Sequence, residues 1–148
     1  MSSRSQSSNL GPGAAYHLAL MSPDEWLAAY RTAWIERDPD AAAALFTEDA
    51  TYLEQPYGEA FVGPQGAHDY WKRVTATQDN VEVIYGTPVS SGNRIAVEWW
   101  VTLTNGGAPI TLAGEFMLTF DESGLCRTLR EYWHFAEGTQ SPPPGWGS

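Results

Sequence analysis

The sequence is poor in cysteine and in basic residues, and both shortages restrict what the chain can do. Cys126 is the single cysteine, so no disulfide can form within the chain, and zinc-finger or CxxC redox spacings are excluded. The chain has eight Lys and Arg residues and 18 Asp and Glu residues, which gives a formal charge of -10. Because a negative field repels phosphate backbones and acidic lipid surfaces, we expect neither nucleic acid nor a membrane as a partner.

Long apolar runs and metal-ligand clusters are also missing. The stretch AAYHLAL near the N-terminus is interrupted by His17 and is too short for a signal sequence or a membrane span, so we expect a cytoplasmic protein. Three histidines without a pair at ligand spacing predict no metal site. The segment GPQG at 63–66 lacks the lysine of a phosphate-binding loop, and we expect no cofactor.

Aromatic residues are abundant instead. They make up 13% of the 148 residues and include seven Trp and seven Tyr, a load that suits a fold with an internal cavity. The length predicts a single domain. We place it at 21–137, after a disordered Ser- and Gly-rich extension at 1–20 and before a Pro- and Gly-rich tail at 138–148.

Three helices are expected in the first half of the chain. Ser22 can cap the first, and Asp40 is expected to cap a short second helix over 41–46. A short strand is predicted at 51–55 and a third helix at 64–75. Aromatic residues recur every fourth position on one face of the first helix: Trp26, Tyr30 and Trp34.

After the third helix the hydrophobic period changes to two, which predicts four strands: 81–88, 94–104, 108–120 and 125–135. Helices followed by an antiparallel meander indicate an α+β fold, with three N-terminal helices packed on a curved sheet. Gly114 offers a place for the bend of that sheet.

Strand alternation places one carboxylate on an otherwise apolar face. That face carries Ile95, Val97, Trp99, Val101, Leu103, Leu112, Gly114, Phe116, Leu118, Leu129, Glu131, Trp133 and Phe135. Desolvation by these neighbours is expected to raise the pKa of Glu131 and strengthen it as a base. The alternative is that an arginine such as Arg37 or Arg127 pairs with it and lowers the pKa.

The opposite sheet face carries Trp100, Met117 and Tyr132 among charged residues. A contiguous apolar patch of this size is costly to expose, and the helices are already committed to the other face. We therefore expect a homodimer through this outer face. The alternative is that the tail, with its three prolines, folds back and Trp146 shields the patch.

Two segments carry a resemblance to a known superfamily. FTEDATYLEQPYGEAFVG with the following Tyr-Trp helix, and FDESGLCRTLREYWHF near the end, resemble nuclear-transport-factor-2-like domains over roughly Ser22 to Phe135. The resemblance implies a cone-shaped fold around one apolar pocket. Its members include isomerases, cyclases, dehydratases, epoxide hydrolases and binders, and the broad SnoaL-like (polyketide-cyclase-like) group is the most similar.

The ketosteroid isomerase pattern within this superfamily is partly met. The resemblance places Tyr30 on the oxyanion-hole tyrosine and either Glu54 or Gln55 on the general base. The second oxyanion donor of that family falls on Phe116, which has no proton to donate, and Trp133 matches a pocket tryptophan.

The limonene epoxide hydrolase pattern is partly met as well. Tyr52 and Glu54 fall on the pair that positions water in that family, and Glu131 falls on its catalytic base. Where that family has an Arg-x-Asp motif on its second strand, this sequence has Trp-Trp-Val at 99–101. The aspartic acid that would protonate an epoxide is therefore missing.

Together these observations predict a cofactor-independent acid/base enzyme for a small apolar organic substrate. Glu131 or Glu54 would move a proton and Tyr30 would stabilise an oxyanion, in an isomerisation, cyclisation, dehydration or hydrolysis. The expected ligand-binding residues are Trp34, Tyr52, Gln55, His68, Trp71, Trp99, Phe116 and Trp133. A non-catalytic binder of a hydrophobic ligand and a structural homodimer with a filled core are the alternatives.

Overall fold

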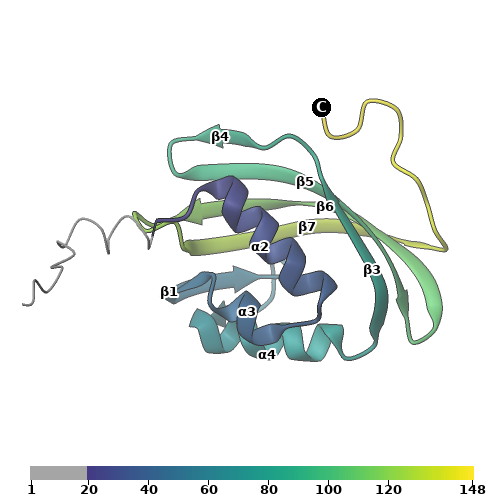
Figure 1. Cartoon of the computed structure of the whole chain (residues 1–148), viewed down its shortest axis with the longest axis horizontal. Helices are drawn as coiled ribbons and strands as arrows, with labels where there is room; N and C mark the ends of the chain where they lie inside the picture. The colour runs from purple at the N-terminus through teal and green to yellow at the C-terminus, as the bar shows by residue number, and fades with distance from the viewer. Residues whose placement is uncertain (1–19) are drawn as a thin grey trace, which may run out of the picture.

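The computed structural model describes residues 20–148, and within them three helices pack on one face of a curved, largely antiparallel seven-stranded sheet (Figure 1). The predicted α+β class is confirmed, whereas the expected disorder of the N-terminal extension concerns residues that lie almost wholly outside this range. The elements are α2 (Pro23–Ile35), α3 (Pro39–Ala43), β1 (Phe46–Leu53), β2 (Phe61–Val62), α4 (Gly63–Thr75), β3 (Gln78–Tyr85), β4 (Val89–Ser91), β5 (Arg94–Asn105), β6 (Ala108–Phe120) and β7 (Cys126–Glu137).

The sheet has the order β2-β1-β7-β6-β5-β3, with β4 paired to β5 outside this path. All of its strand pairs are antiparallel except β1 with β7, which run parallel. Strands β5, β6 and β7 are long and follow one another as hairpins, as the sequence predicted. The β1–β7 pairing brings the middle of the chain beside its last strand.

The helix boundaries follow the capping residues. Ser22 caps α2 as predicted and accepts a hydrogen bond from the Glu25 N–H at 3.1 Å. The expected cap of the second helix was wrong: Asp38 caps α3, because Pro39 occupies the first helical position, where its missing N–H costs nothing. None of the helices in residues 20–148 is long and apolar enough to cross a membrane.

Two strands begin earlier than the sequence predicted. β1 starts at Phe46 rather than at 51, and Phe46 therefore belongs to a strand and not to the second helix. β3 starts at Gln78 rather than at 81. In both cases polar residues near the start of the strand interrupt the apolar pattern. In β1 they fall in an irregularity between the pairs Phe46–Cys126 and Thr51–Thr128, whereas in β3 Gln78 and Asp79 pair with β5.

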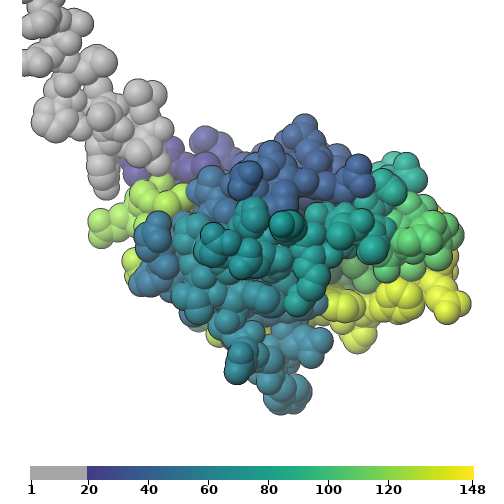
Figure 2. Space-filling model, turned by 90° about the horizontal axis from the view of Figure 1, so that it is seen from below, coloured from purple at the N-terminus to yellow at the C-terminus, as the bar shows by residue number. Residues whose placement is uncertain are grey.

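The helices cover the apolar face of the sheet, except near the end of β7. Trp26, Tyr30 and Trp34 on α2 are all buried against it. Trp133 and Phe135 are 36% and 56% exposed, because the helices do not extend over this end of the strand. In the view from below (Figure 2), the helices cover the sheet and the loop after β1 projects from the body.

The C-terminal tail packs on the outer sheet face at Trp100. Trp146 packs edge-on against Trp100 with ring centroids 5.8 Å apart, and the Trp100 indole N–H donates to the Gln140 carbonyl at 2.9 Å. The backbone N–H of Thr87 donates to the Gly147 carbonyl at 2.7 Å. The expectation that nothing within the chain covers this face was therefore wrong at Trp100, while Tyr132 remains 45% exposed.

Gly114 permits a close approach between β6 and β7. It lies in register between Trp99 on β5 and Trp133 on β7. A Cβ atom at this position would lie 2.3 Å from the Tyr132 carbonyl oxygen and 2.6 Å from the Trp133 Cβ.

We expect Gly114→Ala to destabilise the protein by about 1–3 kcal/mol, because the added methyl group overlaps the neighbouring strand's backbone. Thermal unfolding monitored by circular dichroism measures the effect. Gly58→Ala is the control, since the nearest atom to a Cβ there is 3.7 Å away. Equal melting temperatures for the two variants would contradict the role of Gly114.

Candidate functional site

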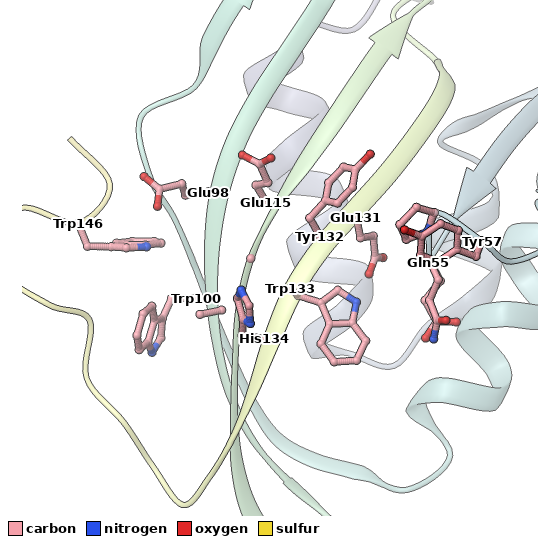
Figure 3. Close-up of a pocket in the computed structure, with 14 residues that line it drawn as sticks. Gln55, Tyr57, Glu98, Trp100, Glu115, Glu131, Tyr132, Trp133, His134 and Trp146 are labelled. Carbon is pink, nitrogen blue, oxygen red and sulfur yellow. The ribbon is translucent and has the colours of Figure 1, made fainter.

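Two hollows meet at Glu131. An inner cavity of about 210 Å³ lies between the helices and the sheet. A wider groove of about 850 Å³ runs along the outer side of the sheet (Figure 3). Three residues line both, namely Glu54, Glu131 and Trp133. The inner cavity is further lined by Trp34, Tyr70, Trp71, Val74, Gln78, Trp99, Asn105, Ile110, Leu112 and Phe135.

A chain of hydrogen bonds from three other elements ends at Glu131. The Trp71 indole N–H donates to the Tyr30 hydroxyl at 2.9 Å, and Tyr30 donates to the Tyr52 hydroxyl at 3.3 Å. The Tyr52 hydroxyl in turn donates to Glu131 Oε1. Residues from α4, α2 and β1 thus fix the position of a single carboxyl group on β7.

The parallel pairing of β1 with β7 places Tyr52 beside Glu131. Tyr52 is in register with Leu129, two residues before Glu131 on the same face of β7. Tyr30 is held in turn by its aromatic neighbours, stacking on Trp26 at 4.7 Å and meeting the edge of Trp71 at 5.4 Å. The donors therefore have little freedom to leave Glu131.

Glu131 is 6% exposed, and burial raises its pKa to about 8. The negative charge of Glu54 raises this pKa further, whereas hydrogen bonds from Tyr52 and Trp133 lower it. The predicted arginine competitors do not contact Glu131: Arg37 pairs with Asp79 at 2.9 Å, and Arg127 lies on an exposed position of β7. At neutral pH the carboxyl group is therefore mainly protonated.

The two tyrosines beside Glu131 remain neutral donors. Burial raises the pKa of both Tyr30 and Tyr52 well above the usual value, and the nearby Glu131 charge acts in the same direction. Neither hydroxyl can supply a tyrosinate base near neutral pH. Their role at the site is to donate hydrogen bonds.

Glu54 is the second carboxylate at the cavity. It follows the end of β1, and its Oε2 lies 3.8 Å from a guanidinium nitrogen of Arg73 on α4 in a partly exposed ion pair. Gln55 lines only the outer groove, so the structure places Glu54, and not Gln55, at the inner cavity.

Several predicted site residues do not form the cavity wall. Tyr30 and Tyr52 are buried behind it, and the Tyr30 hydroxyl is already bonded to Trp71 and Tyr52, so it acts on Glu131 only through Tyr52. Phe116 is buried beside Tyr30 and Trp99, with ring centroids 5.5 Å from each. His68 lies at the surface of α4.

The environment of His68 consists of two acidic residues. Its imidazole nitrogens lie 3.4 Å from an Asp40 oxygen and 3.2 Å from an Asp69 oxygen. The residue lines neither hollow. Its contacts join α4 to α3, which is a structural role.

Sequence reasoning missed three residues that contribute to the site. Tyr70 lies three positions after buried Ala67, a spacing that was available in the sequence, and packs at a tilt against Tyr52 with ring centroids 4.6 Å apart. Gln78 precedes the predicted start of its strand and accepts a hydrogen bond from the Trp34 indole at 2.9 Å. No signal in the sequence pairs Arg73 with Glu54.

The cavity offers no obvious metal site. Among residues 20–148, no three His, Cys, Asp or Glu side chains are grouped so that they would hold a metal ion. The chemistry available at the cavity wall is proton transfer by a carboxyl group and hydrogen bonding by indole groups.

We expect the Glu131 carboxyl to titrate near pH 8, and Tyr52→Phe to raise its pKa further, because this variant removes a hydrogen bond that stabilises the carboxylate. Glu54→Gln should lower the pKa, because it removes a nearby negative charge. Carboxyl-carbon NMR over pH 3–10 measures the pKa of Glu131 in the wild type and in the two variants. A Glu131 that titrates near 4.5 in the wild type would show that the carboxyl is not desolvated.

Comparisons with known proteins place this chain in a family. Residues 27–128 match the family model of the SnoaL-like domain. No protein with a curated description matches the chain in sequence. The solved structures described next are below 25% identical to the chain, so they show the fold alone.

Three of these structures illustrate the range of proteins that share this fold. A protein with a ketosteroid isomerase-like fold from Catenulispora acidiphila, in complex with trimethylamine, is 23% identical and has a TM-score of 0.67, over 76% of this chain and 86% of its own. An epoxide hydrolase of the LEH-like type from M. tuberculosis is 17% identical, with a TM-score of 0.62 over 74% and 80% of the two chains.

The third structure is the epoxide hydrolase/cyclase-like enzyme SalBIII, which is linked to pyran ring formation in the polyether salinomycin. It is 24% identical and has a TM-score of 0.65, over 75% of this chain and 89% of its own. The family match covers more than half of the sequence, and the order of helices and strands agrees with it. The chain therefore belongs to the SnoaL-like domain family, within the nuclear-transport-factor-2-like superfamily.

Proposed function

We propose that this protein is a cofactor-independent enzyme in which Glu131 transfers a proton to or from a small, largely apolar organic molecule bound in the inner cavity. The observation that carries the proposal is a buried carboxyl group, with its pKa raised to about 8, on the wall of an aromatic cavity. Perturbed carboxyl groups of this kind concentrate at catalytic sites.

Glu131 suits both directions of proton transfer. Below about pH 8 the protonated carboxyl donates, and above that pH the carboxylate accepts. Tyr52 holds the group in place, and Tyr30 supports Tyr52 as a positioning residue. Isomerisation, cyclisation, dehydration and hydrolysis each need such a step, and Glu54 supplies a second carboxylate at the cavity.

A non-catalytic binder is the second candidate. A computationally designed 17-OHP binder has this fold, at 18% identity and a TM-score of 0.63, so the fold can hold a ligand without chemistry. The four tryptophans of the cavity wall, Trp34, Trp71, Trp99 and Trp133, suit either role. The cavity itself argues against the third candidate, a structural dimer with a filled core.

5-Nitrobenzisoxazole tests the proposed chemistry without knowledge of the natural substrate. A base removes the proton at C3, the N–O bond breaks, and the coloured 2-cyano-4-nitrophenolate forms. We expect the rate to rise through about pH 8 as Glu131 ionises, and to fall about a hundredfold in Glu131→Gln. Glu82→Gln, on an exposed position of β3, is the matched control and should react as the wild type does.

Equal rates in the wild type and Glu131→Gln would contradict the proposal. So would a rate in the wild type that is independent of pH between 6 and 9. Loss of activity in Glu131→Gln while the control and the wild type agree, with both variants folded by circular dichroism, supports it.

We also propose that the protein forms a homodimer through the part of the outer sheet face that the tail leaves open. Tyr132 is 45% exposed there, in register with Glu115 on β6. Arg130 on the same face offers a partner for Glu98 or Glu115 of a second copy. One self-complementary patch would then serve both subunits.

Light scattering at micromolar concentration tests this assembly. We expect a particle of twice 16.3 kDa, and a monomer when Tyr132→Glu places a charge in the interface. Val62→Glu, at an exposed apolar position of the edge strand β2, is the control and should remain dimeric. A wild-type monomer would contradict the dimer, and a dimer that survives Tyr132→Glu would contradict this surface.

A further inference from the structure

The C-terminal tail is held on the outer sheet face at several points. The Gln140 backbone N–H donates to the Thr111 hydroxyl at 2.9 Å, and the Gln140 carbonyl accepts the Trp100 indole N–H. Further along the tail, Gly147 lies so close to Gly86 that a Cβ atom on Gly86 would be 2.7 Å from the Gly147 Cα. The tail is thus a fixed part of the molecule, yet the chemistry proposed for the inner cavity does not use it.

The tail supplies one wall of the outer groove. Trp146 lines this groove together with Trp100, and their ring planes stand at 77° to each other with centroids 5.8 Å apart. Both indoles are only partly buried. Two aromatic rings at nearly a right angle form a corner in which both can contact the same ligand. Because the face of an aromatic ring carries negative potential, such a corner attracts cations.

A carboxylate lies beside this corner. Glu98 precedes Trp100 by two residues on the same outer face of β5, about 7 Å away along the strand, and it also lines the groove. A Cβ atom on Gly86 would meet the Glu98 Cβ at 3.4 Å as well as the Gly147 Cα, so Glu98 adjoins the docked tail. Figure 3 shows Glu98, Trp100 and Trp146 together at one end of the groove.

The charge of Glu98 is not compensated within the described part of the chain. Its side chain takes part in none of the ion pairs among residues 20–148. Glu115 on β6 stands directly opposite it, and like charges at opposed positions destabilise a sheet. The groove lining has no Lys or Arg, and its one basic residue is His134. A bound cation would relieve this repulsion.

The lining also indicates the kind of cation. Ca²⁺ and Mg²⁺ require several oxygen ligands around one point, and no three acidic side chains among residues 20–148 are grouped in that way. An alkylated ammonium ion has a diffuse charge and an apolar surface, which aromatic rings beside one carboxylate suit. The formal charge of -10 adds a long-range attraction for any cation.

We propose that the outer groove is a second binding site, in which Glu98, Trp100 and Trp146 bind a small organic cation with an alkylated ammonium group. The inference goes beyond the proposed function, because this ligand lies outside the inner cavity. It gives the docked tail a role, since Trp146 completes the aromatic corner. It also assigns Glu98 to the ligand, which leaves Glu115 as the partner of Arg130 of a second copy in the proposed dimer.

Two probes of nearly equal shape test this site. Choline carries a trimethylammonium group where 3,3-dimethyl-1-butanol carries an uncharged tert-butyl group. The full chain, labelled with ¹⁵N-tryptophan, is titrated with each probe, and the indole signals are followed by NMR. The signals that Trp100→Phe and Trp146→Phe remove identify the two indoles of the corner.

We expect choline to move the signals of both indoles and to bind about fivefold more tightly than the alcohol. Glu98→Gln should weaken choline binding about threefold, because it removes an exposed ion pair, and should leave binding of the alcohol unchanged. Trp146→Ala should weaken choline binding by a similar factor. Glu82→Gln is the matched control, since it removes the same charge from an exposed position of β3 outside the groove, and should bind choline as the wild type does.

Equal binding of choline and the alcohol would overturn the inference. The same holds if choline does not bind at millimolar concentration, if it binds without moving the Trp146 signal, or if Glu98→Gln leaves its affinity unchanged. The outcome is independent of the proposed chemistry, because Glu131→Gln is expected to bind choline as the wild type does. Loss of choline binding in Glu131→Gln would instead locate the cation at the inner cavity and contradict this site.

Discussion

The hydrogen bond from Tyr52 to Glu131 is the interaction on which the rest of the site depends. It joins the parallel pair β1 and β7, which lie far apart in the sequence. Through Tyr30 and Trp71 the same network reaches α2 and α4. A carboxyl group buried without such partners would be far more costly, because it would lose its solvation and gain nothing in return.

Aromatic residues have two separate tasks in this fold. Those on α2 and at the centre of the sheet fill the core, where Trp26 meets Phe120 edge to face and Tyr30 meets Phe116 in the same way. Those nearer the open end, Trp99 and Trp133 among them, bound a cavity that the helices do not fill. Gly114 lies in register between Trp99 and Trp133, where its missing side chain lets β7 approach β6 closely.

The sequence predicted the parts of the structure that depend on local periodicity. Alternation along β5, β6 and β7 identified the inner face and singled out Glu131 as its one carboxylate, because neighbouring side chains in a strand point to opposite faces. Capping chemistry predicted the start of α2 but misplaced that of α3, where Asp38 and Asp40 are both suitable caps and Pro39 decides between them.

The parts that the sequence did not predict depend on contacts between distant segments. The ion pair of Glu54 with Arg73, and the use of the Tyr30 hydroxyl by Trp71, arise only when α4 lies beside β1 and α2. The contact of Trp146 with Trp100 was foreseen only as an alternative to a dimer. The hydrogen bond from Trp100 to the Gln140 carbonyl was not foreseen, because any residue would supply that backbone group.

The burial of Glu131 also links folding to the uptake of a proton. Its pKa is about 8 in the folded chain, against a usual value of 4.5 that applies once unfolding exposes the side chain. Between these two values the folded state holds a proton that the unfolded state releases, so the free energy of unfolding decreases as the pH rises from about 4.5 to about 8. The carboxyl group that equips the cavity for proton transfer thus makes the native state less stable at the upper end of this pH interval than at the lower end. The same rise in pH that converts Glu131 into a base therefore lowers the free energy of unfolding.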